Sequence, residues 1–182
     1  MRTALLVIAF AFSPAAGAHS ISDEFAEGFG GVSWRMSFSD VVRQFPGGYQ
    51  VFSTSPGGVA YVVNIEDPVL GISREGQYVV FQAAADGSLM DIDIQIPFEQ
   101  AESLIRVISD RFGPVIGPKA VGLAKVYSWP IDGNFSMTVR TTHVARSGLA
   151  TLSIMKVSRR SSSPSNTGDS RGPQTSNGSV RR

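Results

Sequence analysis

Apolar and polar side chains alternate along residues 89–96, and this alternation constrains the fold more than any other part of the sequence. The apolar members occupy every second position and acidic or amide side chains lie between them: Met90, Ile92, Ile94 and Ile96 alternate with Asp91, Asp93 and Gln95. Successive side chains of a β-strand point to opposite faces, so a strand of this kind has one buried and one solvated face. We therefore expect a sheet that is covered on one side only.

Two segments have the spacing of short amphipathic helices. Residues 37–45 carry an apolar stripe at positions i, i+3, i+4 and i+7, and Ser37 and Asp40 have the spacing of a capping box. A second stripe runs through residues 98–112, which begin after Pro97 and end before a Gly-Pro pair. Each helix has one apolar face, so each is expected to lie on the covered side of the sheet.

Strand-like runs follow each helix, and turn residues separate them. We expect strands at residues 49–54, 59–64, 77–83, 89–96, 123–129, 134–143 and 149–157. The predicted fold class is α+β, an antiparallel β-sheet with two helices packed on one face. Because a helix precedes each group of strands, the single domain expected at residues 32–158 divides into halves, 32–97 and 98–158, which suggests a tandem α-β-β-β repeat.

Residues 1–18 have the layout of a secretory signal peptide. Arg2 supplies a positive start, an apolar run (ALLVIAFAF) follows, and the small residues Ala16-Gly17-Ala18 precede the expected cleavage site. The apolar run is too short to span roughly 30 Å of hydrocarbon as a helix. We therefore expect an exported chain, periplasmic or secreted, that has no transmembrane anchor after cleavage near Ala18.

The chain contains no cysteine, which excludes several ways of stabilising or tethering an exported protein. Without cysteine there is no disulfide framework, no thiolate zinc site and no residue to carry the lipid of a lipoprotein. The fold must therefore be stabilised by packing.

Charge is distributed unevenly along the chain. Residues 19–31 carry three acidic and no basic side chains, and we expect them to form a flexible lead-in. Residues 159–182 carry five arginines and one aspartate, with a single aliphatic residue, and we expect them to be a disordered basic tail. The unit between these segments is close to neutral, which argues against nucleic acid as a partner.

The sequence GVSWRMS at residues 31–37, leading into the first helix, resembles the opening of small uncharacterised exported or envelope proteins of Gram-negative bacteria. Phe112-Gly113-Pro114, which closes the second helix before a strand that contains Trp129, resembles the same proteins. The helix–three-strand unit is also similar in architecture to the β-lactamase inhibitor protein, whose two units form a concave sheet that grips an enzyme. It is similar, too, to the small lipoprotein of the outer-membrane β-barrel assembly machine, a one-unit scaffold. The resemblance covers residues 32–158 and implies a role in binding other proteins.

Asp91 and Asp93 are the candidate catalytic carboxylates. They project from one face of the predicted strand, about 6.5 Å apart at roughly 3.3 Å per residue. Such a pair can act as a general acid and base or bind a divalent cation. The alternative is that the two aspartates are simply polar positions on the solvated face of an alternating strand. His143 is the only histidine of the expected domain, and the sequence contains no nucleophile-elbow motif (G-x-S-x-G) whose serine it could activate. The sequence therefore assigns no catalytic residue, metal site or cofactor outright.

Tyrosines on the uncovered sheet face can anchor a partner, because Tyr and Trp are frequent in interface hot spots. Tyr78 and Tyr127 are the candidates for this role. We expect an exported protein-binding module, an envelope adaptor or an inhibitor, that holds another envelope or exported protein on its helix-free face. The alternative is a small exported hydrolase that uses Asp91 and Asp93, with or without a divalent metal.

Overall fold

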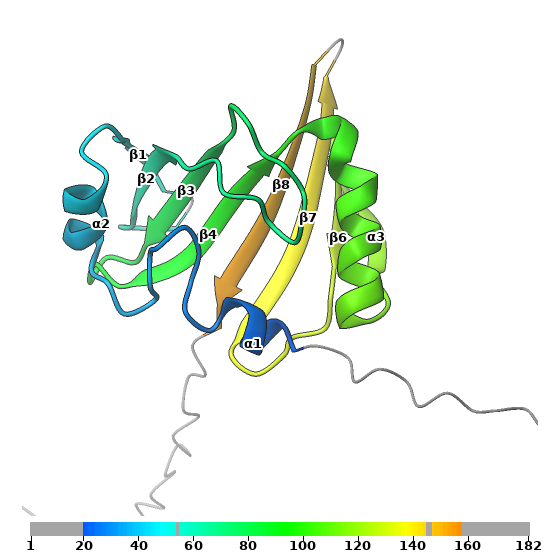
Figure 1. Ribbon diagram of the computed structural model, residues 1–182, viewed down its shortest axis with the longest axis horizontal. Coiled ribbons are helices and arrows are strands. Elements are labelled where there is room, and N and C mark those ends of the chain that lie inside the picture. Colours follow the sequence, from blue (N-terminus) through cyan, green and yellow to red (C-terminus); the bar gives the residue numbers. More distant parts are fainter. Residues whose placement is uncertain (1–19, 54, 145–146, 158–182) are drawn as a thin grey trace, which may run out of the picture.

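The computed structural model describes residues 20–53, 55–144 and 147–157 (Figure 1). The predicted signal peptide, residues 1–18, and the predicted basic tail, residues 159–182, lie outside these ranges. Three α-helices and one short 3-10 helix are present in the described chain: α1 (Ile21–Phe25), α2 (Phe38–Gln44), η1 (Phe98–Gln100) and α3 (Ala101–Phe112).

Eight strands form one antiparallel sheet, so the chain has an α+β fold as predicted. In chain order they are β1 (Tyr49–Phe52), β2 (Val59–Asn64), β3 (Tyr78–Ala83), β4 (Leu89–Ile96), β5 (Ile116–Val121), β6 (Ala124–Ser128), β7 (Phe135–Val144) and β8 (Ser147–Lys156). Their order across the sheet is β1-β2-β3-β4-β8-β7-β6-β5. Each half of the chain is thus a meander, and the last strands of the two halves, β4 and β8, pair at the centre.

Four strands follow α2 in the first half and four follow α3 in the second, and a shorter helix, α1 or η1, precedes each of these two helices. The second half therefore contains one strand more than the sequence predicted. That strand, β5, lies at the edge of the sheet and all six of its residues are exposed. Its residues Gly117 and Pro118 are poor strand formers, which explains why the sequence pattern did not indicate it.

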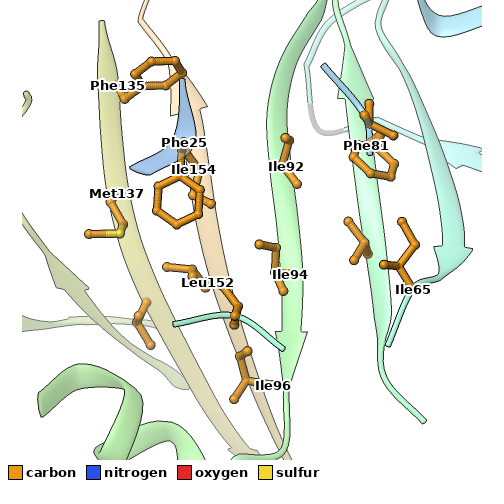
Figure 2. Close-up of a cluster of buried hydrophobic side chains, with 14 of the residues drawn as sticks. Phe25, Ile65, Phe81, Ile92, Ile94, Ile96, Phe135, Met137, Leu152 and Ile154 are labelled. Carbon is orange, nitrogen blue, oxygen red and sulfur yellow. The ribbon is translucent and has the colours of Figure 1, made fainter. Parts of the chain in front are cut away.

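One apolar core lies between the sheet and the helices. The inward residues of the central strands are fully buried, and side chains from all three α-helices pack against them. Figure 2 shows this layer, with Phe25 of α1 lying over β8: its labelled residues are Phe25, Ile65, Phe81, Ile92, Ile94, Ile96, Phe135, Met137, Leu152 and Ile154. The helices consequently lie on one side of the sheet, which confirms the predicted packing (Figure 1).

Helix α2 begins with the capping box that the sequence predicted. The Ser37 side chain accepts from the Asp40 backbone N–H, and the Asp40 carboxylate accepts from the Ser37 backbone N–H. The first helical residue, Phe38, donates its backbone N–H to the carbonyl of Gly87, which lies in the β3–β4 turn. Val41 is fully buried, so the cap and one apolar anchor together fix this short helix on the sheet.

Residues 19–31 differ from the flexible lead-in that the sequence predicted, because they contain α1. Ile21 and Phe25 are only 2% and 3% exposed and join the core. They are four residues apart, hence on the same face of the helix, while the acidic residues of α1 point away. The indole N–H of Trp34 donates to the carbonyl of Phe25 at 2.6 Å and holds the segment in place.

Arg74 is a fully buried cation in the long connection between β2 and β3. Its guanidinium lies 5.5 Å from the centre of the Phe29 ring and donates to four backbone carbonyls, those of Ile65, Asp67, Tyr78 and Gln95. Burial lowers the pKa of Arg74 to about 10, so the side chain stays charged at neutral pH. One side chain thus ties the connection to β3 and β4.

We expect Arg74→Met to lower the free energy of unfolding by about 3 kcal/mol or more, because it leaves one buried and three part-buried carbonyls without their donor. The measurement is urea unfolding of the full chain. Arg43→Met is the matched control: Arg43 lies exposed on α2 in an ion pair with Asp40, and its loss should cost less than about 1 kcal/mol. Equal stabilities of the two variants would contradict this role of Arg74.

Candidate functional site

The side of the sheet opposite the helices, which we call the outer face, is polar over its central strands. The inward residues of β4, β8 and β7 belong to the core, so the alternate residues of these strands point outward. The outward residues are Asp91, Asp93, Gln95, Ser136, Thr138, Arg140, Thr151, Ser153 and Met155. Apart from Asp91, each of these is at least partly exposed.

Asp91 and Asp93 lie together on the outer face, as predicted, and Gln82 of β3 bridges them. The amide nitrogen of Gln82 lies 2.6 Å from a carboxylate oxygen of Asp93 and 3.3 Å from one of Asp91. The hydroxyl of Ser53 donates to the amide oxygen of Gln82 at 3.1 Å, which orients the bridge. The hydroxyl of Ser153, directly opposite Asp93 on β8, donates to the other oxygen of Asp93.

The bridge leaves Asp91 incompletely bonded. Asp91 is 8% exposed, and its Oδ1 atom is buried without a hydrogen-bond partner among the described residues. Burial, and after it the charge of Asp93, raises the pKa of Asp91 to about 7. The backbone N–H of Ile92 and the charge of Arg140 act in the opposite direction. A buried carboxylate beside a second carboxylate is unfavourable for the fold, and such sites are frequently functional.

Sequence reasoning missed Gln82 and Ser153, the residues that complete this site. Gln82 lies in an otherwise apolar run, and the Asp86-Gly87 turn fixes the hairpin register in which Gln82 pairs with Asp91. From that turn the sequence could have predicted that Gln82 lies opposite Asp91. Ser153 could not be predicted from a local turn, because its pairing with Asp93 depends on the contact between the two halves of the chain.

Tyr78 lies at the start of β3, 42% exposed. Its neighbour Val79 points into the core, so Tyr78 points to the outer face. The structure therefore places this predicted partner-binding residue on the helix-free face, at the end of β3 that is far from the Gln82 bridge.

Tyr127 does not lie on the outer face, contrary to the sequence-based expectation. It pairs with the buried Val139 and packs against the core on the helix side. There it lines a hollow of about 340 Å³ between α3 and the sheet, together with Phe98, Ile105 and other residues. Both Val126 and Tyr127 are apolar, so the strand pattern alone did not decide which of them points inward.

His143 is exposed near the end of β7, in agreement with a solvated strand-end residue. Its ring lies 5.2 Å from that of Phe98, centre to centre.

Comparison with protein-family models, curated protein sequences and solved structures finds no match to this chain. None of the helices in the described part is both long and apolar enough to span a membrane.

The raised pKa of Asp91 gives the folding stability a defined pH dependence. Between about pH 4, near the ordinary aspartate value of 3.8, and about pH 7, the unfolded chain has released the proton that the folded chain still holds. The free energy of unfolding should therefore fall as the pH rises through this window, by up to about 4 kcal/mol, and level off above it.

Asp91→Asn removes this ionisation, so the variant should be more stable than the wild type at pH 8, with a much smaller difference at pH 5. Urea unfolding of both proteins at the two pH values is the measurement. If the free energy of unfolding falls equally between pH 5 and pH 8 in the wild type and in the variant, Asp91 is not the cause of the fall.

Proposed function

We propose that this chain is an exported binding module that docks a partner protein on its outer face. The observation that carries the proposal is the combination of a sheet face that no described helix covers with a buried carboxylate, Asp91, whose oxygen has no partner among the described residues. Burying a charged group without full hydrogen bonding costs free energy, and a basic partner group near the more exposed Asp93 would offset part of that cost through the charge of the pair.

The composition of the outer face favours a polar interface. Its hydroxyl, amide and carboxylate groups offer donors and acceptors, and Tyr78 and Met155, 42% and 41% exposed, add larger apolar contacts at its margins. Protein–protein interfaces of the non-obligate kind are about as polar as the rest of a protein surface and carry roughly one hydrogen bond per 100–200 Å². A face of this kind suits such a partner better than an apolar ligand.

The expected partner presents a basic side chain to this face. Asp93 is partly exposed and accepts hydrogen bonds from Gln82 and Ser153, both neutral donors. Within the described residues, neither Asp91 nor Asp93 forms an ion pair. A lysine or arginine of the partner would compensate the two carboxylates and orient the complex, since complementary charge contributes mainly to specificity and association rate.

A carboxylate hydrolase is the second candidate function. The difference in burial between the two carboxylates favours a hydrolase. Asp91 has a raised pKa and is protonated over part of the neutral range, and it lies beside the more exposed Asp93, as in an acid–base couple. Against it, the amide of Gln82 donates to both carboxylates and thus occupies the space between them. No third His, Cys, Asp or Glu joins them as a metal ligand in the described ranges.

The binding proposal is tested by photo-crosslinking in the exporting cell. A photo-reactive amino acid is placed at Thr138 or Thr151 on the outer face, and at Glu102 or Arg106 on α3 as the matched control. We expect both outer-face positions to crosslink to the same protein and the α3 positions not to do so. Asp93→Arg should reduce that product by about tenfold or more, because it opposes a basic partner, whereas Glu102→Arg should leave it unchanged.

Crosslinks from α3 alone, or none from either outer-face position, would contradict the proposal. Hydrolysis of a substrate that is lost in both Asp91→Asn and Asp93→Asn would favour the enzyme instead.

A further inference from the structure

The hollow of about 340 Å³ between α3 and the sheet has an apolar floor. Three large aromatic or aliphatic side chains line it, and each is only partly buried: Phe98 of η1, Ile105 of α3 and Tyr127 of β6. The volume is at the small end of the range of about 300–1,000 Å³ that is typical of ligand pockets. The hollow therefore has the size and the apolar surface to take a small ligand with one apolar group.

The packing of α3 explains why the hollow lies over β6. Leu104 of α3 is fully buried in the core, whereas the next residue, Ile105, is only partly buried. On β6, Tyr127 pairs with the inward Val139, so it points to the helix side, and Lys125, two residues before it, points to the same side. The core thus ends before β6, and the inward side chains of this strand face the hollow.

Phe98 is held at another wall of the hollow by close packing. Its ring lies against Gly148 of β8, where a β-carbon would be 2.3 Å from the nearest ring atom, so the glycine leaves room for the ring. On β7, His143 pairs with Gly148, and its ring lies 5.2 Å from that of Phe98, centre to centre. This wall is fixed by the fold itself, as in the largely pre-formed pockets of small-molecule sites.

Charged side chains of both signs border the hollow. Glu99 and Glu102 line it from the η1–α3 side, and Lys125 lines it from β6. All three are exposed, and none of them forms an ion pair within the described part of the chain. The hollow therefore has carboxylates at one side of its apolar floor and an ammonium group at the other.

We propose that the hollow binds a small zwitterion with an apolar side chain, which is the chemistry of a free aromatic amino acid such as phenylalanine. The ammonium group of the ligand faces Glu99 and Glu102, its carboxylate faces Lys125, and its side chain lies on the apolar floor. This site is on the helix side of the sheet, so the proposal does not rest on the function proposed for the outer face.

The two signs of charge select a zwitterion over a simple amine or acid. An amine leaves Lys125 without a counter-charge, and an acid brings its carboxylate close to Glu99 and Glu102, so each has one unfavourable or missing contact. Exposed ion pairs contribute little affinity, and one apolar side chain provides most of the contact area. We therefore expect a dissociation constant of about 0.1–5 mM for phenylalanine.

Titration of the purified, isotope-enriched full chain, followed through its amide NMR signals, tests the proposal. L-Phenylalanine should shift the signals of Ile105, Tyr127 and Thr141 saturably, and those of Thr138 and Ser153 on the outer face should not move. Phenethylamine, which lacks the carboxylate, and 3-phenylpropanoate, which lacks the ammonium group, should bind at least about fivefold more weakly. Glycine, which lacks the side chain, should give no saturable shift up to about 20 mM.

Charge variants separate direct contact from a general effect on the fold. Lys125→Glu should weaken phenylalanine binding about fivefold or more and leave phenethylamine binding equal or stronger, because it replaces the cation that opposes an amine. Glu99→Gln should weaken the binding of both ligands that carry an ammonium group but not that of 3-phenylpropanoate. All these positions are exposed, so the variants should fold.

The matched controls are Lys119→Glu and Asp110→Asn. Lys119 on β5 pairs with Val126 and so points to the other side of the sheet from Tyr127, and Asp110 is exposed two turns further along α3 than Glu102. Both controls should bind phenylalanine like the wild type. Equal affinity of the wild type for the three aromatic ligands, a loss of affinity in the controls equal to that in Lys125→Glu, or no saturable shift at the hollow would overturn the proposal.

Discussion

The structure depends on burial from one side of a single sheet. The inward side chains of the central strands, such as Ile94 and Leu152, are completely buried, and the three α-helices and the β2–β3 connection all cover that same side. Burial of each such side chain contributes roughly 1.5–3 kcal/mol, and without disulfides this layer has to stabilise the fold. Arg74 completes the cover, because its bonds to four carbonyls hold the irregular connection against β3 and β4.

Much of this arrangement could be predicted from local sequence. The alternation in β4 identified which face the helices leave free and placed Asp91 and Asp93 on it together, although Asp91 is buried there and not solvated as the alternation predicted. The capping box of Ser37 and Asp40 marked the start of α2 to within a residue. These predictions succeeded because each follows from neighbours in the sequence, through strand alternation or helix spacing. One register detail differs: a shift in the β3–β4 pairing buries Leu89, 3% exposed, and leaves Met90 only half-buried.

The remaining features depend on contacts between distant segments. The side on which Tyr127 lies is set by its pairing with Val139, and Ser153 reaches Asp93 only because the two halves pair through β4 and β8. The acidic composition of residues 19–31 concealed the two-residue apolar face of α1, which the core and Trp34 stabilise. Arg74 carries no sequence signal at all, since a buried arginine differs from an exposed one only in what the fold places around it.

The most direct test of the account is the chemical accessibility of the two sides of β7. Thiols are introduced singly by Thr138→Cys, on the outer face, and by Val139→Cys, which replaces a side chain with 0% exposure. In the purified chain in high salt, the first thiol should react with a maleimide at close to the rate of a free thiol, and the second at least about a hundredfold more slowly, because it reacts only when the fold opens. Equal protection of both thiols would mean that the outer face is covered, and it would contradict the one-sided fold from which the proposed function is drawn.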